Sequence, residues 1–268
     1  MKRVIAALLC GLALFATTAC AAKKPEVEYY LSKRQIEHST GDVNLTVNEY
    51  DDAWRILSAK TYLNGELSSK LDYTYSEDSG LVTVKTSSAL YGESVSEYRQ
   101  EFDEEGRLAK SVSYNEGAIV GSTEYSYDSE GRELEVKSFD ADGKVYSTLT
   151  NEYDSKGNLI SYTVKTAYYS SRQENTYDKY DRISCAEMFK NDELEAYIEF
   201  SGDKNSRQGS VYSPEGKVTG TTNVLYDDAG NVLMEENYDA LGTLTMRTCY
   251  EYLGTDGSVS SGINLNKA

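Results

Sequence analysis

The sequence contains few of the residues that interrupt strands or that carry out catalysis. Among 268 residues there are two prolines, one histidine and one tryptophan. His38 lies in a polar stretch with no cysteine beside it, whereas a Ser/His/Asp site requires a positioned base. Pro25 and Pro214 are too few to break a long series of strands. We therefore expect an extended, β-rich chain without nucleophilic catalysis.

Cysteine is also scarce, with four in the whole chain. Cys10 and Cys20 lie in or next to the N-terminal apolar run, which leaves Cys185 and Cys249. These two have neither metal-ligand spacing nor the pattern of a disulfide framework. We expect both to be buried free thiols, with a disulfide between them as the alternative, and we expect no cofactor.

Only one long apolar run is present, at residues 4–16, between a basic start and a small-residue exit. It is shorter than the roughly 20 residues of a membrane-spanning helix and is typical of a secretory signal. Cys20 directly after Ala19 resembles the bacterial lipobox, which implies a lipidated mature N-terminus. Cleavage near Ala19 or Ala22 of an ordinary signal peptide is the alternative. We predict a signal peptide at 1–19, and a lipidated Cys20 with a short tether at 20–28.

Basic residues are also few compared with acidic ones. Without residues 1–19 the chain keeps 25 basic and 44 acidic residues, a net charge of −19. Such a surface repels nucleic acid and anionic lipid head groups, so nucleic-acid binding is not expected. The predicted location is the exterior or periplasmic side of a bacterial cell membrane or outer membrane.

Aromatic residues are abundant by contrast and recur every 12 to 14 residues, usually before Asp and a Gly-centred turn. Clear copies are Phe102-Asp103-Glu104-Glu105-Gly106, Tyr127-Asp128-Ser129-Glu130-Gly131 and Tyr153-Asp154-Ser155-Lys156-Gly157. The Asp carboxylate accepts from backbone N–H groups further along the turn, and Gly supplies a positive φ. A fixed period of this kind indicates stacked supersecondary units.

The segments between these turns are rich in Tyr, Val, Thr and Leu and predict β-strands. The expected fold is all-β: repeated antiparallel hairpins at residues 29–252, forming one long, curled or spiral sheet. The less regular residues 29–98 are interpreted as cap-like, and residues 253–268 as a Gly/Ser-rich tail. About sixteen strands must coil, wrap or close, because twisted open sheets rarely exceed about 10 strands. The register stays open: a two-residue turn places Tyr125 opposite Leu134, and a glycine bulge shifts the pairing by one.

The motif copies resemble the Rhs or YD repeat, with good matches at residues 102–159 and 212–244. Family members build spiral β-sheets, some of which form shells around toxins, and others work at cell surfaces in carbohydrate or protein contact. The chain has fewer repeats than such shells and no toxin-like segment after Tyr252, so a cage is not expected.

No metal or catalytic centre stands out. Asp140-Ala141-Asp142-Gly143 begins like a calcium loop but lacks the remaining ligands, so we interpret it as a turn. Tyrosines outside the repeat position are candidates for exposed sugar contacts, together with Trp54; they are Tyr29, Tyr30, Tyr73, Tyr162 and Tyr169.

The sequence thus favours a non-enzymatic, lipid-anchored YD-repeat protein that binds a polysaccharide or a protein. One alternative is a glycan-acting hydrolase with paired carboxylates, and another is a structural or immunity partner of a secreted toxin. The sequence identifies neither the ligand residues nor the oligomeric state.

Overall fold

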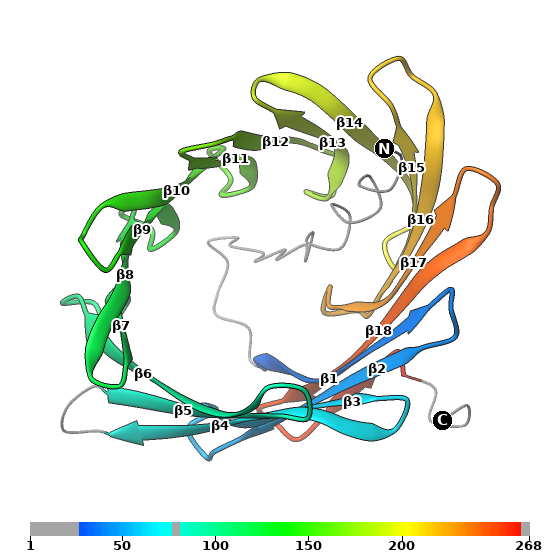
Figure 1. Ribbon diagram of the computed structural model, residues 1–268. Helices are drawn as coiled ribbons and strands as arrows, with labels where there is room; N and C mark the ends of the chain where they lie inside the picture. The colour runs from blue at the N-terminus through cyan, green and yellow to red at the C-terminus, as the bar shows by residue number, and fades with distance from the viewer. Residues whose placement is uncertain (1–26, 77–80, 264–268) are drawn as a thin grey trace.

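The computed structural model describes residues 27–76 and 81–263, and these form nineteen strands in one antiparallel sheet (Figure 1). The strands are β1 (Tyr29–His38), β2 (Val43–Tyr50), β3 (Ile56–Leu63), β4 (Glu66–Ser76), β5 (Leu81–Ser88), β6 (Gly92–Phe102), β7 (Leu108–Asn115), β8 (Ala118–Tyr127), β9 (Glu133–Asp140), β10 (Val145–Tyr153), β11 (Leu159–Thr166), β12 (Ser170–Tyr177), β13 (Ile183–Lys190), β14 (Glu193–Gly202), β15 (Ser206–Tyr212), β16 (Val218–Tyr226), β17 (Val232–Asp239), β18 (Leu244–Gly254) and β19 (Val259–Ser261). The predicted all-β fold of repeated hairpins is confirmed. Within the described part of the chain no helix is suited to crossing a membrane.

The sheet closes on itself. Each strand pairs with the next along the chain, and β1 pairs with both β2 and β18, so β1 to β18 form a ring. Figure 1 shows this ring end on, with β1 and β18 side by side at the seam. Residues 29–98, interpreted from the sequence as cap-like, contribute strands to the same ring, and the short β19 lies against the end of β18. The number of strands led us to expect that the sheet coils, wraps or closes, and the sheet closes.

Curvature comes from a bulge that follows the repeat aromatic. Tyr127 pairs with Glu133, whereas the preceding Ser126 pairs with Glu135, so that Leu134 is the extra residue. The same one-residue shift recurs at most other hairpins, including those after Tyr50, Phe102, Tyr153 and Tyr226. A bulge bends the strand and increases its twist, and repeated bulges let the strip curl until its edges meet.

Neither register expected from the sequence is correct. Tyr125 lies opposite Val136 rather than Leu134. The glycine bulge at Gly131 shifts the pairing by one residue, and the second bulge at Leu134 shifts it by one more. Two shifts restore the parity, which is why the apolar residues stay on one face.

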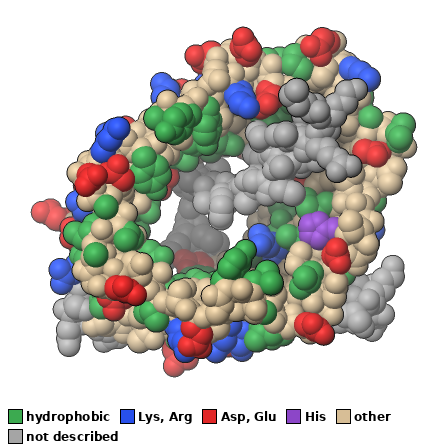
Figure 2. Space-filling view, viewed as in Figure 1, with side chains coloured by type: hydrophobic (Ala, Val, Ile, Leu, Met, Phe, Trp, Pro, Cys, Tyr) green, Lys and Arg blue, Asp and Glu red, His purple; other side chains and the backbone are tan. Residues whose placement is uncertain are grey.

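The two faces of the sheet differ. One carries the repeat tyrosines and the most buried apolar side chains, among them Val84, Ala186 and Val224. The other carries ion pairs such as Lys110–Glu124. No large side chain among the described residues is completely buried, and the space-filling view shows a ring with an opening through it (Figure 2). Packing is therefore one layer deep.

Turns alternate between two rims. The turns after β2, β6, β8, β10, β12 and β16 carry the Tyr/Phe-Asp motif or a close variant, and we call their edge the YD rim. The turns after β1, β3, β5, β7, β9, β11, β13, β15 and β17 form the second rim, where only those after β9 and β17 carry a Tyr/Phe-Asp pair, Phe139-Asp140 and Tyr238-Asp239.

Candidate functional site

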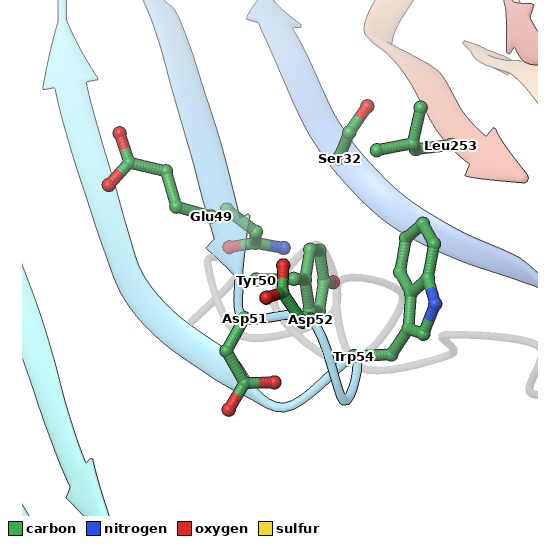
Figure 3. A pocket seen from close by; sticks show the side chains of 8 residues that line it. Ser32, Glu49, Tyr50, Asp51, Asp52, Trp54 and Leu253 are labelled. Carbon is green, nitrogen blue, oxygen red and sulfur yellow. The ribbon is translucent and has the colours of Figure 1, made fainter. Parts of the chain in front are cut away.

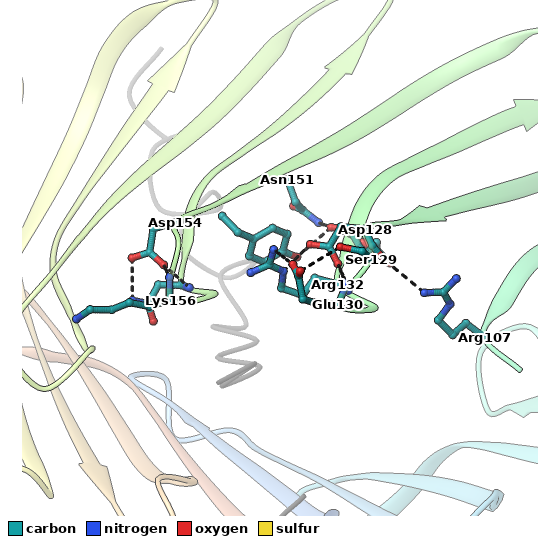
Figure 4. Close-up of polar contacts among 11 residues, drawn as sticks. Arg107, Asp128, Ser129, Glu130, Arg132, Asn151, Asp154 and Lys156 are labelled. Carbon is teal, nitrogen blue, oxygen red and sulfur yellow. Dashed lines mark hydrogen bonds and ion pairs between the residues drawn. The ribbon is translucent and has the colours of Figure 1, made fainter. Parts of the chain in front are cut away.

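The YD turns are built around one aspartate each. In the turn after β8, the Asp128 carboxylate accepts from the backbone N–H of Glu130 at 2.9 Å and of Arg132 at 2.8 Å (Figure 4). The Arg132 side chain pairs with the same carboxylate, and Gly131 closes the turn at φ 82°. Partial burial opposes ionisation, yet these bonds from Arg132 and Glu130 hold the pKa of Asp128 below its usual value. The turn chemistry expected from the sequence is confirmed.

Each turn is also tied to its neighbour on the rim. The Tyr153 hydroxyl donates to the Glu133 carbonyl at 2.9 Å, and the Asn151 amide donates to the same oxygen at 3.0 Å. Tyr50, Tyr75, Tyr127 and Tyr177 make the equivalent bond to the hairpin before them. Burial raises the pKa of Tyr177 to about 12, which keeps this donor protonated.

Arginines stack on the tyrosine of the next turn. The Arg132 guanidinium lies 4.9 Å from the Tyr153 ring centre, and Arg107 lies 4.7 Å from that of Tyr127. The repeat thus joins one arginine to the aspartate of its own turn and to the tyrosine of the next. These contacts give a structural role to the tyrosines that donate to the neighbouring hairpin, namely Tyr50, Tyr75, Tyr127, Tyr153 and Tyr177.

At one turn without the tyrosine, an arginine replaces it. The turn after β14 has no tyrosine before it, and the buried Arg207 donates to the Ile183 carbonyl instead. Its guanidinium lies 4.8 Å from the Phe200 ring centre. Burial lowers the pKa of Arg207. The architecture therefore accounts for the terminal nitrogen of Arg207 that donates to Ile183, whereas its buried Nε has no hydrogen-bond partner among the described residues.

One YD turn departs from the pattern at the seam of the ring. Tyr50-Asp51-Asp52-Ala53-Trp54-Arg55 places tryptophan where most other turns have glycine. Trp54 adopts φ 60°, a left-handed conformation that is unfavourable for a bulky side chain. The Asp51 carboxylate still accepts from the N–H of Ala53 and Arg55, so the turn itself is intact. Backbone strain of this kind is often found at functional sites.

Trp54 belongs to a cluster of three aromatic rings. It stacks on Tyr30 of β1 with ring centres 4.8 Å apart and an interplanar angle of 15°. Tyr50 of β2 meets Tyr30 edge to face at 5.6 Å. Ring closure contributes to this cluster, because Tyr30 pairs with Leu253 of β18 and lies beyond the β1–β2 ladder, which begins at Lys33.

A cavity of about 490 Å³ lies beside the cluster. We call it the seam pocket; it is lined by Ser32, Asn48, Glu49, Tyr50, Asp51, Asp52, Trp54 and Leu253. Figure 3 shows Trp54, Tyr50 and Asp52 together at the β2–β3 turn, with Ser32 and Leu253 across from them. Its walls thus come from both ends of the chain.

The carboxylates of the seam pocket differ in their contacts. The hydrogen bond from Lys60, supported by Ser58, lowers the pKa of Glu49, and the Arg55 backbone N–H lowers that of Asp51. Asp52 is exposed and has no hydrogen bond among the described residues. The pocket therefore offers ionised acceptor groups next to an aromatic surface.

The residues singled out from the sequence are scattered. Cys20 lies outside the described residues. His38, at the end of β1, contacts the Asn44 amide at 3.0 Å. The Asp140 carboxylate accepts from the N–H of Asp142 and of Lys144, as a turn requires. Within the described ranges, no group of His, Cys, Asp or Glu side chains is arranged to hold a metal ion.

The two cysteines, and the tyrosines outside the repeat position, differ in their exposure. Cys249 is buried and Cys185 half-buried, and both are free. Tyr169 is exposed, whereas Tyr29, Tyr73 and Tyr162 are half-buried. Only Tyr30 joins Trp54. Aligning the turn at Tyr50 with the other YD turns would have revealed the tryptophan in the glycine position, which sequence reasoning missed.

A closed antiparallel sheet with repeated Tyr-Asp turns defines a YD-repeat structural protein. The family model described as Teneurin YD-shell matches residues 24–241, and the chain belongs to this family. The suspected Rhs/YD membership is thereby confirmed. No curated protein matches the sequence.

The solved structures to which the chain is similar include three with low sequence identity. A porin-like protein from Bacteroides uniformis is 15% identical with a TM-score of 0.48, covering 83% of this chain and 96% of that one. A porin-like protein from Bacteroides vulgatus is 10% identical with a TM-score of 0.35, covering 83% and 98%. The Tc holotoxin pore of Photorhabdus luminescens is 12% identical with a TM-score of 0.25, covering 84% of this chain but 16% of that one.

Proposed function

We propose that this protein is an exported, non-enzymatic binding module that is held on a membrane by a lipid on Cys20 and binds a neutral polysaccharide in the seam pocket. The observation that carries the proposal is Trp54 in a left-handed conformation, at a position where most YD turns use glycine. The turn would form without a tryptophan, so the ring itself is the feature that needs an explanation.

The chemistry of the pocket suits a sugar. A cavity with an aromatic wall and a few placed polar groups is typical of small-molecule sites, whose volumes are about 300–1,000 Å³. Trp54 and Tyr50 supply the apolar surface against which the C–H face of a sugar ring packs, and Asp52 and Ser32 supply polar atoms for hydroxyl groups. The net charge of −19 without residues 1–19 disfavours an acidic polysaccharide.

Binding is better supported than hydrolysis. Two-carboxylate glycoside hydrolysis needs one carboxyl group held protonated as an acid, usually by burial. In the seam pocket, contacts with Lys60 and with the Arg55 backbone lower the pKa of Glu49 and Asp51 respectively. Both groups therefore stay ionised, which favours hydrogen bonding to a ligand over proton donation.

The test uses the fact that Trp54 is the only tryptophan. Titration with neutral oligosaccharides selected on a glycan array should shift its fluorescence. Trp54→Gly lacks this fluorophore and is assayed on the array itself, where it should lose binding while the fold stays intact. Tyr180→Ser is the matched control, since Tyr180 is an exposed aromatic residue of another YD turn. An empty array, or full binding by Trp54→Gly, would overturn the proposal.

The lipid anchor has its own test. Cells expressing the protein should incorporate labelled palmitate into it, and Cys20→Ala should lose the label and be released from the membrane fraction. Unchanged labelling of Cys20→Ala would refute the anchor without affecting the seam pocket.

A further inference from the structure

The two rims of the ring differ in polarity. On the second rim, the tip after β5 carries Leu90, 82% exposed, and Tyr91, 90% exposed, and the tip after β11 carries Tyr168, 94% exposed. The tips between them expose Ile119 with Val120, and Val145 with Tyr146, each about half accessible. The YD rim carries Asp–Arg turns at most of the corresponding places. Large exposed apolar patches on a soluble protein mark interaction sites.

These residues form one continuous arc. Five tips that follow one another around the ring, after β3, β5, β7, β9 and β11, each expose a pair of apolar side chains. The pair after β3 is Leu63 with Leu67, and the pair after β11 is Tyr168 with Tyr169. We call these five tips the apolar arc. The tips after β13 and β1 are polar, and those after β15 and β17 expose one apolar residue each, Val218 and Leu241.

We propose that the apolar arc is the interface of a rim-to-rim dimer with a second copy of this chain. A two-fold axis through the tip after β7, perpendicular to the ring axis, places Ile119 and Val120 against themselves. The same rotation places the tip after β5 on the partner's tip after β9, and the tip after β3 on the partner's tip after β11. Apolar pairs thus face apolar pairs throughout the arc, as an isologous interface requires.

The same rotation also pairs the remaining tips of the second rim with tips of similar polarity. It places the tip after β17 on the partner's tip after β15, so that Leu241 meets the partner's Val218, the two exposed apolar residues outside the arc. It places the polar tip after β1, with Thr40 and Asp42, on the partner's polar tip after β13, with Asn191 and Asp192. A single operation therefore matches the polarity of all nine tips, which an unrelated partner would have no reason to do.

The charged residues beside the apolar arc and the area of the arc are consistent with a second copy of the chain as the partner. The rotation brings Lys165 towards the partner's Glu66, and Lys144, which has Asp140 and Asp142 beside it, towards the partner's Glu93; Glu93 also pairs with Lys85 of its own chain at 2.9 Å. Aromatic side chains bury about 150–250 Å² each, so the arc supplies on the order of the ~800 Å² per copy of a standard interface. Glu116 lies closest to the axis and would face its own copy.

The oligomeric state in solution tests the proposal. Sedimentation velocity of the purified full chain over a range of concentrations should show a monomer–dimer equilibrium. The double substitution of Leu90→Ser with Tyr91→Ser should raise the dissociation constant at least tenfold, and Glu116→Gln should lower it. Tyr180→Ser, which removes an exposed aromatic from the YD rim, should leave it unchanged. Circular dichroism confirms that each variant is folded.

Cross-linking tests the geometry. Ile119→Cys should form a disulfide with its own copy on mild oxidation, whereas Leu241→Cys should do so only when mixed with Val218→Cys. A chain that stays monomeric, a dimer weakened by Tyr180→Ser but not by the double substitution, or cross-links that grow into long polymers would each overturn the proposal. Monomers that instead bind vesicles of neutral phosphatidylcholine through the arc would also overturn it.

Discussion

At the scale of single residues, the side chains of each repeat donate hydrogen bonds to backbone carbonyls at the ends of the strands, where the hydrogen bonds between strands stop. The Tyr153 hydroxyl and the Asn151 amide both donate to the Glu133 carbonyl. The sequence predicted the role of aspartate in the turn, because its bonds are local. It did not predict the tyrosine bond, because the acceptor belongs to the preceding hairpin, 20 residues away.

Removing this donor should cost a measurable amount of stability. Tyr153→Phe leaves the ring under Arg132 but removes the hydroxyl from a half-buried carbonyl, so we expect a loss of about 1 kcal/mol in the free energy of unfolding. Urea denaturation measures the change. Tyr146→Phe is the control, since Tyr146 is 56% exposed and its variant should show no loss. Equal denaturation midpoints for the two variants would contradict a stabilising hydrogen bond from Tyr153.

The candidate site was only partly accessible from sequence at this scale. Trp54 and Tyr30 were singled out as aromatic residues that could meet a sugar. Their stacking depends on where the start of β1 lies, and there Tyr30 pairs with Leu253 of β18, more than 200 residues along the chain, rather than with the neighbouring β2. No local pattern carries this information.

At the scale of elements, the unit is a hairpin with two irregularities, the glycine turn and the bulge after it. The sequence located the turns because Gly and Asp mark them. The second bulge has no marker residue: the extra residue is Leu134 in one hairpin and Ile160 in another. The register was therefore not predictable from the motif.

The glycine position should tolerate only residues that accept a positive φ. A Cβ on Gly131 would meet no atom closer than 3.8 Å at a φ of 82°, so the Cβ itself has room and backbone strain is the expected source of a loss. Gly131→Val should destabilise the protein by roughly 1–3 kcal/mol. Gly131→Asn should cost much less, because Asn tolerates this conformation and Asp181 adopts it at φ 55° in another turn. Thermal or urea denaturation that ranks the two variants equally would be inconsistent with this account.

The same hairpin should respond to acid. Because the pKa of Asp128 is lowered in the folded state, despite the opposing effect of burial, by bonds from Arg132 and Glu130, its stabilisation is present above the unfolded pKa of about 4 and is lost as pH falls through the lower folded value. Denaturation at pH 7, 5 and 3 should show a smaller acid-induced loss for Asp128→Asn than for the parent chain. Glu104→Gln, an exposed carboxylate in a neighbouring turn, should keep the parent's pH dependence.

At the scale of the whole molecule, closure determines which surfaces exist. An open spiral would expose the edges of β1 and β18, and unpaired edges invite association with other chains. The ring removes both edges, creates the seam pocket and gives every tip a fixed neighbour on its rim. Strand number and the limit on open sheets predicted that the strip must coil, wrap or close; the choice among these depends on the summed bend of all the bulges.

Closure can be tested with a single substitution at the seam. Gln35 of β1 lies directly opposite the native Cys249 of β18. Gln35→Cys should therefore form a disulfide with Cys249, since Cβ atoms of opposite residues in antiparallel strands lie about 4.5–5.5 Å apart, and a small backbone adjustment brings them within the roughly 3.5–4.5 Å of a disulfide. The closed loop spans most of the chain, so the chain-entropy relation gives a stabilisation of about 5 kcal/mol at most. Non-reducing peptide mapping identifies the bond, and denaturation with and without reductant measures its effect.

Two controls make the outcome specific. The same substitution with Cys249→Ser should form no such bond, and Gln35→Ser should leave stability close to that of the parent chain. A bond from residue 35 on β1 to Cys185 on β13 would be incompatible with the ring, because the five strands β14 to β18 lie between β13 and β1. Failure to cross-link with Cys249 while the strands remain folded would mean that the sheet is an open spiral, and the seam pocket and the matched rim would then both be lost.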